Sequence, residues 1–270
     1  MITKKVVFLH PNLNTMNIAF ISAILPVLLL LWFIYRKDRE HPEPLGKLLL
    51  TFFVGCFSVI PAGLLESMLA PLGPDAGTAP VLNGLYNGYC VAGLSEELCK
   101  LLLLMWVIWR SPHFDEYFDG IVYAVYLSLG FACVENISYV FGGSDPIGTA
   151  LMRGLLAVPA HFLFAVTMGY YLSLAKFDPA GRRRHLWKAL IFPVLLHGTY
   201  DALLMVSSNL GGSDGIVATG ITGVLFVVFI VFDIRMWRWG LKRIKRLQQR
   251  SREQGFDRLH PFDGFTWNFK

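Results

Sequence analysis

Long apolar runs separated by short polar connections make up most of the chain. A helix needs about 20 apolar residues to cross the hydrocarbon core of a bilayer. The pattern predicts seven such helices, at residues 17–35, 47–70, 85–109, 118–141, 150–175, 186–208 and 215–237. Since little sequence remains for a soluble domain, the expected fold class is all-α: one polytopic bundle of about seven transmembrane helices.

Basic residues in the connections predict how the bundle is oriented. Lys and Arg occur in the first, third and fifth connections and after the last run, whereas the second and sixth connections contain none. Cytoplasmic loops carry the excess of these residues, so the amino terminus is expected outside and the carboxyl terminus in the cytoplasm. Asp145 and Arg153, in or beside the fourth connection, are interpreted as interfacial residues without a role in function.

The chain is expected to divide into residues 1–240, one integral-membrane domain, and residues 241–270, a basic cytoplasmic tail. We interpret the basic segment as an interfacial anchor, with a regulatory lipid or protein site as the alternative. The composition, 54% hydrophobic and 16% charged with a formal net charge of +5, excludes an ordinary soluble domain. The positive charge follows from the cytoplasmic segments and does not indicate a nucleic-acid partner. The expected location is the plasma or inner membrane, with the lipid bilayer as a partner.

Ionisable residues inside the apolar runs are the strongest indication of function. Glu96 and Glu97 lie in the third run, with Lys100 one turn further on. A charged group at the bilayer centre costs about 2.5–3.5 kcal/mol on insertion scales, so such groups usually mark functional sites. Four more polar residues lie in three later runs: Glu135, His161, His197 and Asp201. At about 1.5 Å rise per residue, the groups of all four helices fall in one layer, from mid-membrane to the outer half.

The spacing of these residues places them on common helix faces. Glu96 and Lys100 are four positions apart, as are His197 and Asp201, so each pair shares a face. A polar stripe on a membrane helix must face the bundle interior or a water-filled cavity. A structural role, in ion pairs or hydrogen bonds between helices, is the alternative for each residue alone. The shared depth of the whole set favours a functional site.

The chemistry of this set suits hydrolysis of a peptide bond. Two adjacent glutamates in a poorly hydrated site cannot both ionise cheaply, and Lys100 can pair with one of them. One carboxylate can then act as a general base toward water and as an acid toward the leaving amine. The two histidines can hold the water, protonate the leaving group or stabilise an oxyanion, and Asp201 can orient a histidine. Two histidines with one or two carboxylates are also a plausible Zn²⁺ set.

The motifs, in their order, resemble the PrsW family of intramembrane proteases, within the wider group that includes the type II CAAX prenyl endopeptidases. The first matching segments are Tyr35-Arg36-Lys37-Asp38-Arg39, Pro42-Glu43-Pro44 and Glu96-Glu97-Leu98-Cys99-Lys100, the last of which corresponds to the family's EExxK. The others are Asp119–Tyr123, Gly130–Asn136, His161 and His197–Asp201. The resemblance covers about residues 32–205 and leaves the last run and the basic tail outside it.

The resemblance implies a membrane endopeptidase in which the glutamate pair is central and the histidines assist. The catalytic residues that it implies are Glu96, Glu97, Glu135, His161, His197 and Asp201. Family members are described both as glutamic proteases and as metalloproteases. The absence of a tight spacing such as HExxH favours the glutamic type without a cofactor, and zinc is the alternative. The family is associated with cleaving membrane-anchored anti-sigma factors on the outer side, so a membrane-anchored protein is the expected substrate.

Two other functions stay open from the residues alone. Intramembrane carboxylates also form proton relays, so an ion- or proton-coupled transporter is an alternative, although no inverted repeat is visible. The second alternative is a membrane protein that binds haem or quinone through His161 and His197. Substrate flux across proteoliposomes tests the transporter, and a visible absorbance spectrum tests haem.

Overall fold

The chain is helical throughout the part that the structure describes. The computed structural model describes residues 13–211 and 216–259, and no strand occurs in these ranges. This confirms the all-α fold class. The elements in chain order are α1 (Leu13–Lys37), α2 (Leu45–Leu69), η1 (Ala70–Leu72), α3 (Pro80–Tyr86), η2 (Asn87–Gly93), α4 (Leu94–Ile108), α5 (Asp119–Gly142), α6 (Pro146–Leu155), α7 (Ala157–Phe177), α8 (Arg182–Gly211) and α9 (Ile216–Leu259).

Six helical stretches within the described ranges are long and apolar enough to cross a membrane, as expected of a multi-pass membrane protein. They correspond to all of the predicted runs except the third. That run is helical too, but α3, η2 and α4 follow one another directly, and η2 is a π-helix. The seven predicted helical runs are therefore confirmed, with the third divided into segments of different geometry. The orientation of the termini stays a prediction.

The π-helix η2 lies against α8 through glycines. A Cβ atom on Gly88 would lie 2.6 Å from the backbone nitrogen of Ala202, and one on Gly93 would lie 3.0 Å from that of Gly198. Small residues allow membrane helices to approach this closely. The close approach fixes the start of α4, which follows η2 directly, beside the middle of α8.

The fifth predicted run is divided into α6 and α7 at Leu156. Pro159 has no amide hydrogen and cannot bond to the carbonyl group of Leu155, the last residue of α6. Helix α6 packs against α1, α5 and α7. Pro61 and Pro193 lie within continuous helices, so proline alone does not interrupt the other runs.

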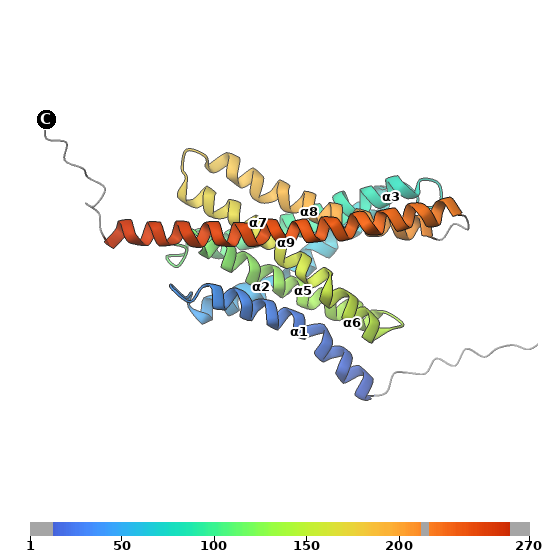
Figure 1. Cartoon of the computed structure of the whole chain (residues 1–270), viewed down its shortest axis with the longest axis horizontal. Coiled ribbons are helices and arrows are strands. Elements are labelled where there is room, and N and C mark those ends of the chain that lie inside the picture. Colours follow the sequence, from blue (N-terminus) through green and yellow to red (C-terminus); the bar gives the residue numbers. More distant parts are fainter. Residues whose placement is uncertain (1–12, 212–215, 260–270) are drawn as a thin grey trace, which may run out of the picture.

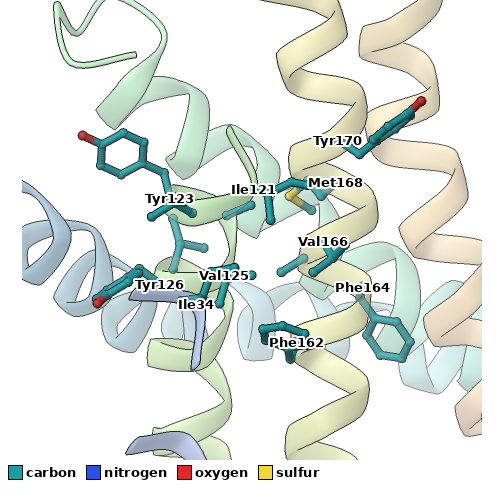
Figure 2. Packing of buried hydrophobic residues seen from close by; sticks show 14 of the residues in the cluster. Ile34, Ile121, Tyr123, Val125, Tyr126, Phe162, Phe164, Val166, Met168 and Tyr170 are labelled. Atoms are coloured by element: carbon teal, nitrogen blue, oxygen red, sulfur yellow. The ribbon is translucent and has the colours of Figure 1, made fainter. Parts of the chain in front are cut away.

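Helices α5 and α7 form the centre of the bundle, with side chains buried around most of their circumference. Ile121 and Val125 of α5 extend toward Val166 and Met168 of α7 (Figure 2). The two backbones come close where a Cβ on Gly169 would lie 2.3 Å from the carbonyl oxygen of Gly120. Helices that are apolar on all sides are typical of the interior of a membrane bundle.

The outer helices expose large apolar side chains, as lipid contact requires. Trp106 of α4 is 77% exposed and Phe57 of α2 is 68% exposed. Helix α9 runs along the bundle over nearly its whole length (Figure 1). Its membrane-facing part carries exposed residues such as Phe226. These surfaces confirm that the bundle is built to be surrounded by hydrocarbon rather than water.

The basic segment after residue 240 continues α9 as helix up to Leu259. It contacts the bundle: Arg243 donates to Thr167 Oγ1 at 3.3 Å, and Arg252 forms an ion pair with Glu40 at 2.7 Å. Part of the segment interpreted as an interfacial anchor thus packs against protein. Residues 260–270 of the predicted tail, like residues 1–12, lie outside the described residues.

Candidate active site

The predicted site residues come from four helices whose inner faces meet. Glu96 and Glu97 lie in the first turn of α4, which η2 holds against α8. Glu135 lies on α5 and His161 on α7, the pair of helices that pack most extensively (Figure 1). His197 lies on α8, which packs against α7 on its other side. Glu96, Glu97, His161 and His197 are buried, and Glu135 is partly buried.

Lys100 is the hub of the buried polar cluster. Its Nζ atom lies 2.8 Å from Glu96 Oε2, 2.9 Å from Glu97 Oε1 and 3.2 Å from His161 Nδ1. The lysine and Glu97 are both 0% exposed. A buried charge is tolerated only when it is paired and hydrogen-bonded, and here one ammonium serves both carboxylates. The expectation that Lys100 pairs with only one glutamate is therefore too narrow.

His161 is fixed from both sides of its ring. An ammonium group only donates, so Nδ1 accepts the bond from Lys100, and the Nε2–H group donates to Glu135 Oε2 at 2.8 Å. The rings of His161 and His197 are 5.2 Å apart between centroids and nearly perpendicular, at 85°. Phe164 stacks on His197 at 4.7 Å. The two imidazoles are thus held in one place by side chains from three helices.

His197 lies between two carboxylates. Its Nδ1 atom is 3.0 Å from Glu97 Oε1, and its Nε2 atom is 3.1 Å from Asp201 Oδ2. The Nδ1–H group donates a hydrogen bond to Glu97, because a carboxylate only accepts, and Asp201 lies within ion-pair distance of Nε2. The geometry agrees with the prediction that Asp201 orients a histidine.

Arg153 joins this network, contrary to its interpretation as an interfacial residue without a role. Its Nη2 atom lies 3.0 Å from Glu135 Oε2, and its Nε–H donates to Asn136 Oδ1 at 3.1 Å. Helix α6, which carries Arg153, packs against α5 and brings the guanidinium to this carboxylate. Asp145 stays outside the network, because its side chain caps α6 by accepting from Gly148 N at 3.0 Å.

The polar cluster lines a cavity of about 550 Å³. Five of the six predicted site residues lie in its wall: Glu96, Glu135, His161, His197 and Asp201. Glu97 does not, and neither does Lys100. The structure thus distinguishes two neighbours that the sequence treats alike: Glu96 faces the cavity, and Glu97 lies behind it.

Glu66 of α2 also lines this cavity and was not among the predicted site residues. It lies three positions from the end of α2 and is partly exposed, so the sequence gives the pattern of an ordinary interfacial acid. The only indication of a role in the sequence is that this acidic residue lies within the second apolar run. Tyr139 and Tyr200, which add hydroxyl groups to the wall, gave no signal, because tyrosine is common in membrane helices.

The donor set fits a metal ion in residue type. Glu96, Glu97, His161 and His197 each offer one ligand atom, and these atoms all lie within 4.8 Å of one another. Two histidines with carboxylates are a common set for Zn²⁺. Lys100 already contacts three of these four side chains, however, and its positive charge would oppose a metal ion placed among them.

Comparison with known proteins identifies a family that matches most of the chain. Residues 43–234 match the model of a family described as "PrsW family intramembrane metalloprotease". The match extends into α9, so the sequence-based expectation that the last run lies outside the resemblance is wrong. It begins at Glu43, so the segment Tyr35–Arg39 lies before it.

Curated relatives carry the same name. The chain is 39% identical to Protease PrsW of Clostridioides difficile (strain 630) over 191 residues, which cover 69% of this chain and 79% of the relative. It is 38% identical to Protease PrsW of Bacillus subtilis (strain 168) over 194 residues, covering 71% of this chain and 85% of the relative. No solved structure matches the chain significantly. The family match covers more than half of the chain, and the chain therefore belongs to the PrsW family of intramembrane proteases.

Proposed function

We propose that the chain hydrolyses a peptide bond in or near the membrane segment of a membrane-anchored protein, with Glu96 as the base that activates water. One observation carries this assignment: Glu96 faces the cavity, whereas Glu97 and Lys100 lie behind it. A general base must reach the reacting water, and Glu96 is the member of the glutamate pair that can do so.

The surroundings of Glu96 leave one oxygen for this task. Lys100 holds Oε2 at 2.8 Å, and Oε1 has no hydrogen-bond partner among the described residues. In the proposed reaction Glu96 takes a proton from water, and the oxygen of the water forms a bond to the carbonyl carbon of the substrate. The tetrahedral intermediate then collapses, the C–N bond breaks, and Glu96 returns the proton to the leaving amine.

The developing oxyanion needs a positive partner in the cavity wall. His197 suits this role, because it faces the cavity and lies between the carboxylates of Glu97 and Asp201. His161, held by Lys100 and Glu135, defines the opposite wall and can position the substrate carbonyl or the water. Glu97 and Asp201 are positioning residues in this scheme, acting through His197.

Zinc is the second candidate for the activating group. It would be held by His161, His197 and Glu96, and when bound it would supply Lewis-acid polarisation and a more acidic water. The contacts of Lys100 with three of the four candidate ligands favour the mechanism without metal. The family description supports the metal, so the test must separate the two.

The place of the cavity supports a membrane-anchored substrate. Its wall includes residues near the predicted outer ends of α2, α3 and α8, such as Glu66, Asn83 and Ser208, so it opens toward the expected outer half of the membrane. A single-span protein with a cleavable segment near the outer surface would fit this arrangement. An anti-sigma-factor-like substrate is the specific form of the proposal.

The decisive experiment compares Glu96→Gln with Glu66→Gln in proteoliposomes that contain a single-span reporter substrate. Both changes remove one carboxylate from the same cavity, but only Glu96 contacts Lys100. Glu96→Gln should lower cleavage at least 1,000-fold, on the order of 4 kcal/mol in barrier, and Glu66→Gln should stay within threefold of wild type. Normal cleavage by Glu96→Gln would exclude the proposal.

The two mechanisms separate in the same assay after metal removal. Protein stripped with a chelator and verified as metal-free by elemental analysis should retain its cleavage rate if Glu96 acts without metal. Loss of cleavage that added Zn²⁺ restores would instead establish the metal-dependent alternative.

A further inference from the structure

A second group of buried carboxylates lies at the opposite end of α5 from the active site. Asp38 follows α1, Glu43 precedes α2, and Asp119 is the first residue of α5. These three residues are 3%, 8% and 0% exposed. They belong to the expected cytoplasmic side, and Asp119 lies sixteen positions before Glu135, about 24 Å away along the helix. The proposed protease chemistry makes no use of them.

Hydrogen bonds hold these carboxylates in fixed positions. The backbone N–H of Glu43 donates to Asp38 Oδ2 at 3.1 Å, and the Tyr123 hydroxyl donates to Glu43 Oε2. The backbone N–H groups of Asp115 and Glu116 donate to Asp119 Oδ2 at 3.0 and 2.8 Å. Each bond fixes the position of one carboxylate oxygen, and the position of the other oxygen of the same group is thereby fixed as well.

The other oxygen of Asp119 has no partner. Oδ1 is fully buried and accepts no hydrogen bond from any described residue. An orphaned buried carboxylate oxygen is costly, and it is rare unless an ion or a water completes it. Asp119 also belongs to both groups of converging ligand atoms at this end of the protein. These are Asp38, Glu116 and Asp119, and Glu43, Asp115 and Asp119, with the atoms of each group within 4.8 Å of one another.

Within residues 13–211 and 216–259, no Lys or Arg forms an ion pair with Asp38, Glu43 or Asp119. The contrast with the active site is direct, because there Lys100 neutralises its two glutamates. Uncompensated carboxylates are expensive to bury, so this group must either hold protons or bind a cation. Oxygen-only donors are the ligands that hard divalent cations prefer.

We propose that this group, the cytoplasmic carboxylate site, binds one hard divalent cation of the Mg²⁺, Ca²⁺ and Mn²⁺ class, with Asp119 as its central ligand. Asp38 and Glu43 supply oxygens from the first connection, and the segment before α5 adds Asp115 or Glu116. The ion would tie the α1–α2 and α4–α5 connections to the base of α5. Its role is structural, so it does not depend on the proposed function.

The test uses the full chain in detergent, stripped with EDTA and then titrated with Mg²⁺, Ca²⁺ or Mn²⁺. At a cation concentration about a hundredfold above the dissociation constant, the Tm should rise by about 5–10 °C. Electron paramagnetic resonance should count one bound Mn²⁺ per chain. Asp119→Asn should abolish both effects, and Glu43→Gln should weaken the binding at least tenfold.

Two variants serve as matched controls. Glu40→Gln removes one charge from the same connection, but Glu40 pairs with Arg252 outside the group, so the cation effect should persist. Glu96→Gln should also keep the effect, which separates this site from any metal in the active site. The proposal is overturned if no cation raises the Tm of the stripped protein, or if Asp119→Asn responds as wild type does. If Asp119→Asn does not fold, unchanged Mn²⁺ binding by Glu43→Gln overturns it.

Discussion

Replacing Lys100 with methionine should destabilise the bundle more than any other single change in the active site. Methionine has nearly the length of lysine but cannot neutralise Glu96 and Glu97, whose oxygens lie 2.8 and 2.9 Å from the ammonium. A hydrogen bond to a charged group contributes about 1.5–3 kcal/mol, and breaking a buried ion pair costs about 3–5 kcal/mol. We therefore expect Lys100→Met to lower the free energy of unfolding by about 3–5 kcal/mol.

A double variant makes this reasoning testable. Adding Glu97→Gln to Lys100→Met removes one of the two unpaired charges and should recover at least half of the lost stability, without restoring cleavage. Unfolding in mixed micelles with increasing denaturing detergent measures the stability, and the single and double variants give the coupling energy. A loss below about 1 kcal/mol for Lys100→Met would refute the burial argument. So would a double variant that is less stable than the single one.

Three further predictions follow from the contacts. Glu97→Gln should lower kcat by about 100-fold with little change in KM, because His197 loses a charged partner but the cavity wall is unchanged; steady-state kinetics on the reporter substrate measure this. Arg153→Gln should lower kcat/KM by about tenfold, the equivalent of one charge-assisted hydrogen bond, and Arg153→Lys should recover part of it in the same assay. In metal-free protein, burial raises the pKa of Asp38 to about 8 and that of Glu43 to about 7. Folding then binds protons, so Tm should fall as the pH rises from about 4 to about 8, and the slope should be shallower in Asp38→Asn.

The sequence was sufficient for the helical runs and for most of the active site. Apolar length predicts membrane helices reliably, because every backbone polar group must be satisfied within the hydrocarbon. Charged residues inside such runs are so costly that Glu96 and His161 could be selected without any knowledge of their neighbours. Their meeting in one cavity followed from depth alone.

The rotation of each helix about its own axis was harder to predict from the sequence. The sequence shows Glu96 and Glu97 as equivalent, and only the packing of α4 against α8 decides which one faces the cavity. Arg153 was misinterpreted because its ion pair with Glu135 depends on how α6 packs against α5, which a run of apolar residues does not show. Asp119 gave no signal as a candidate ligand, because Asp38 and Glu43 come from the distant connection between α1 and α2.

The π-helix η2 has a consequence for how such proteins can change over evolution. Each residue in an α-helix advances the side chains by about 100°, so a single insertion or deletion between α3 and α4 would swing the acid pair away from the cavity. A π-helical segment accommodates a different number of residues per turn than its neighbours and thereby sets this angle. Residues 87–93 therefore set the direction about the helix axis in which Glu96 and Glu97 point. Their number, together with the glycines that pack against α8, should constrain the lineages that share this chemistry.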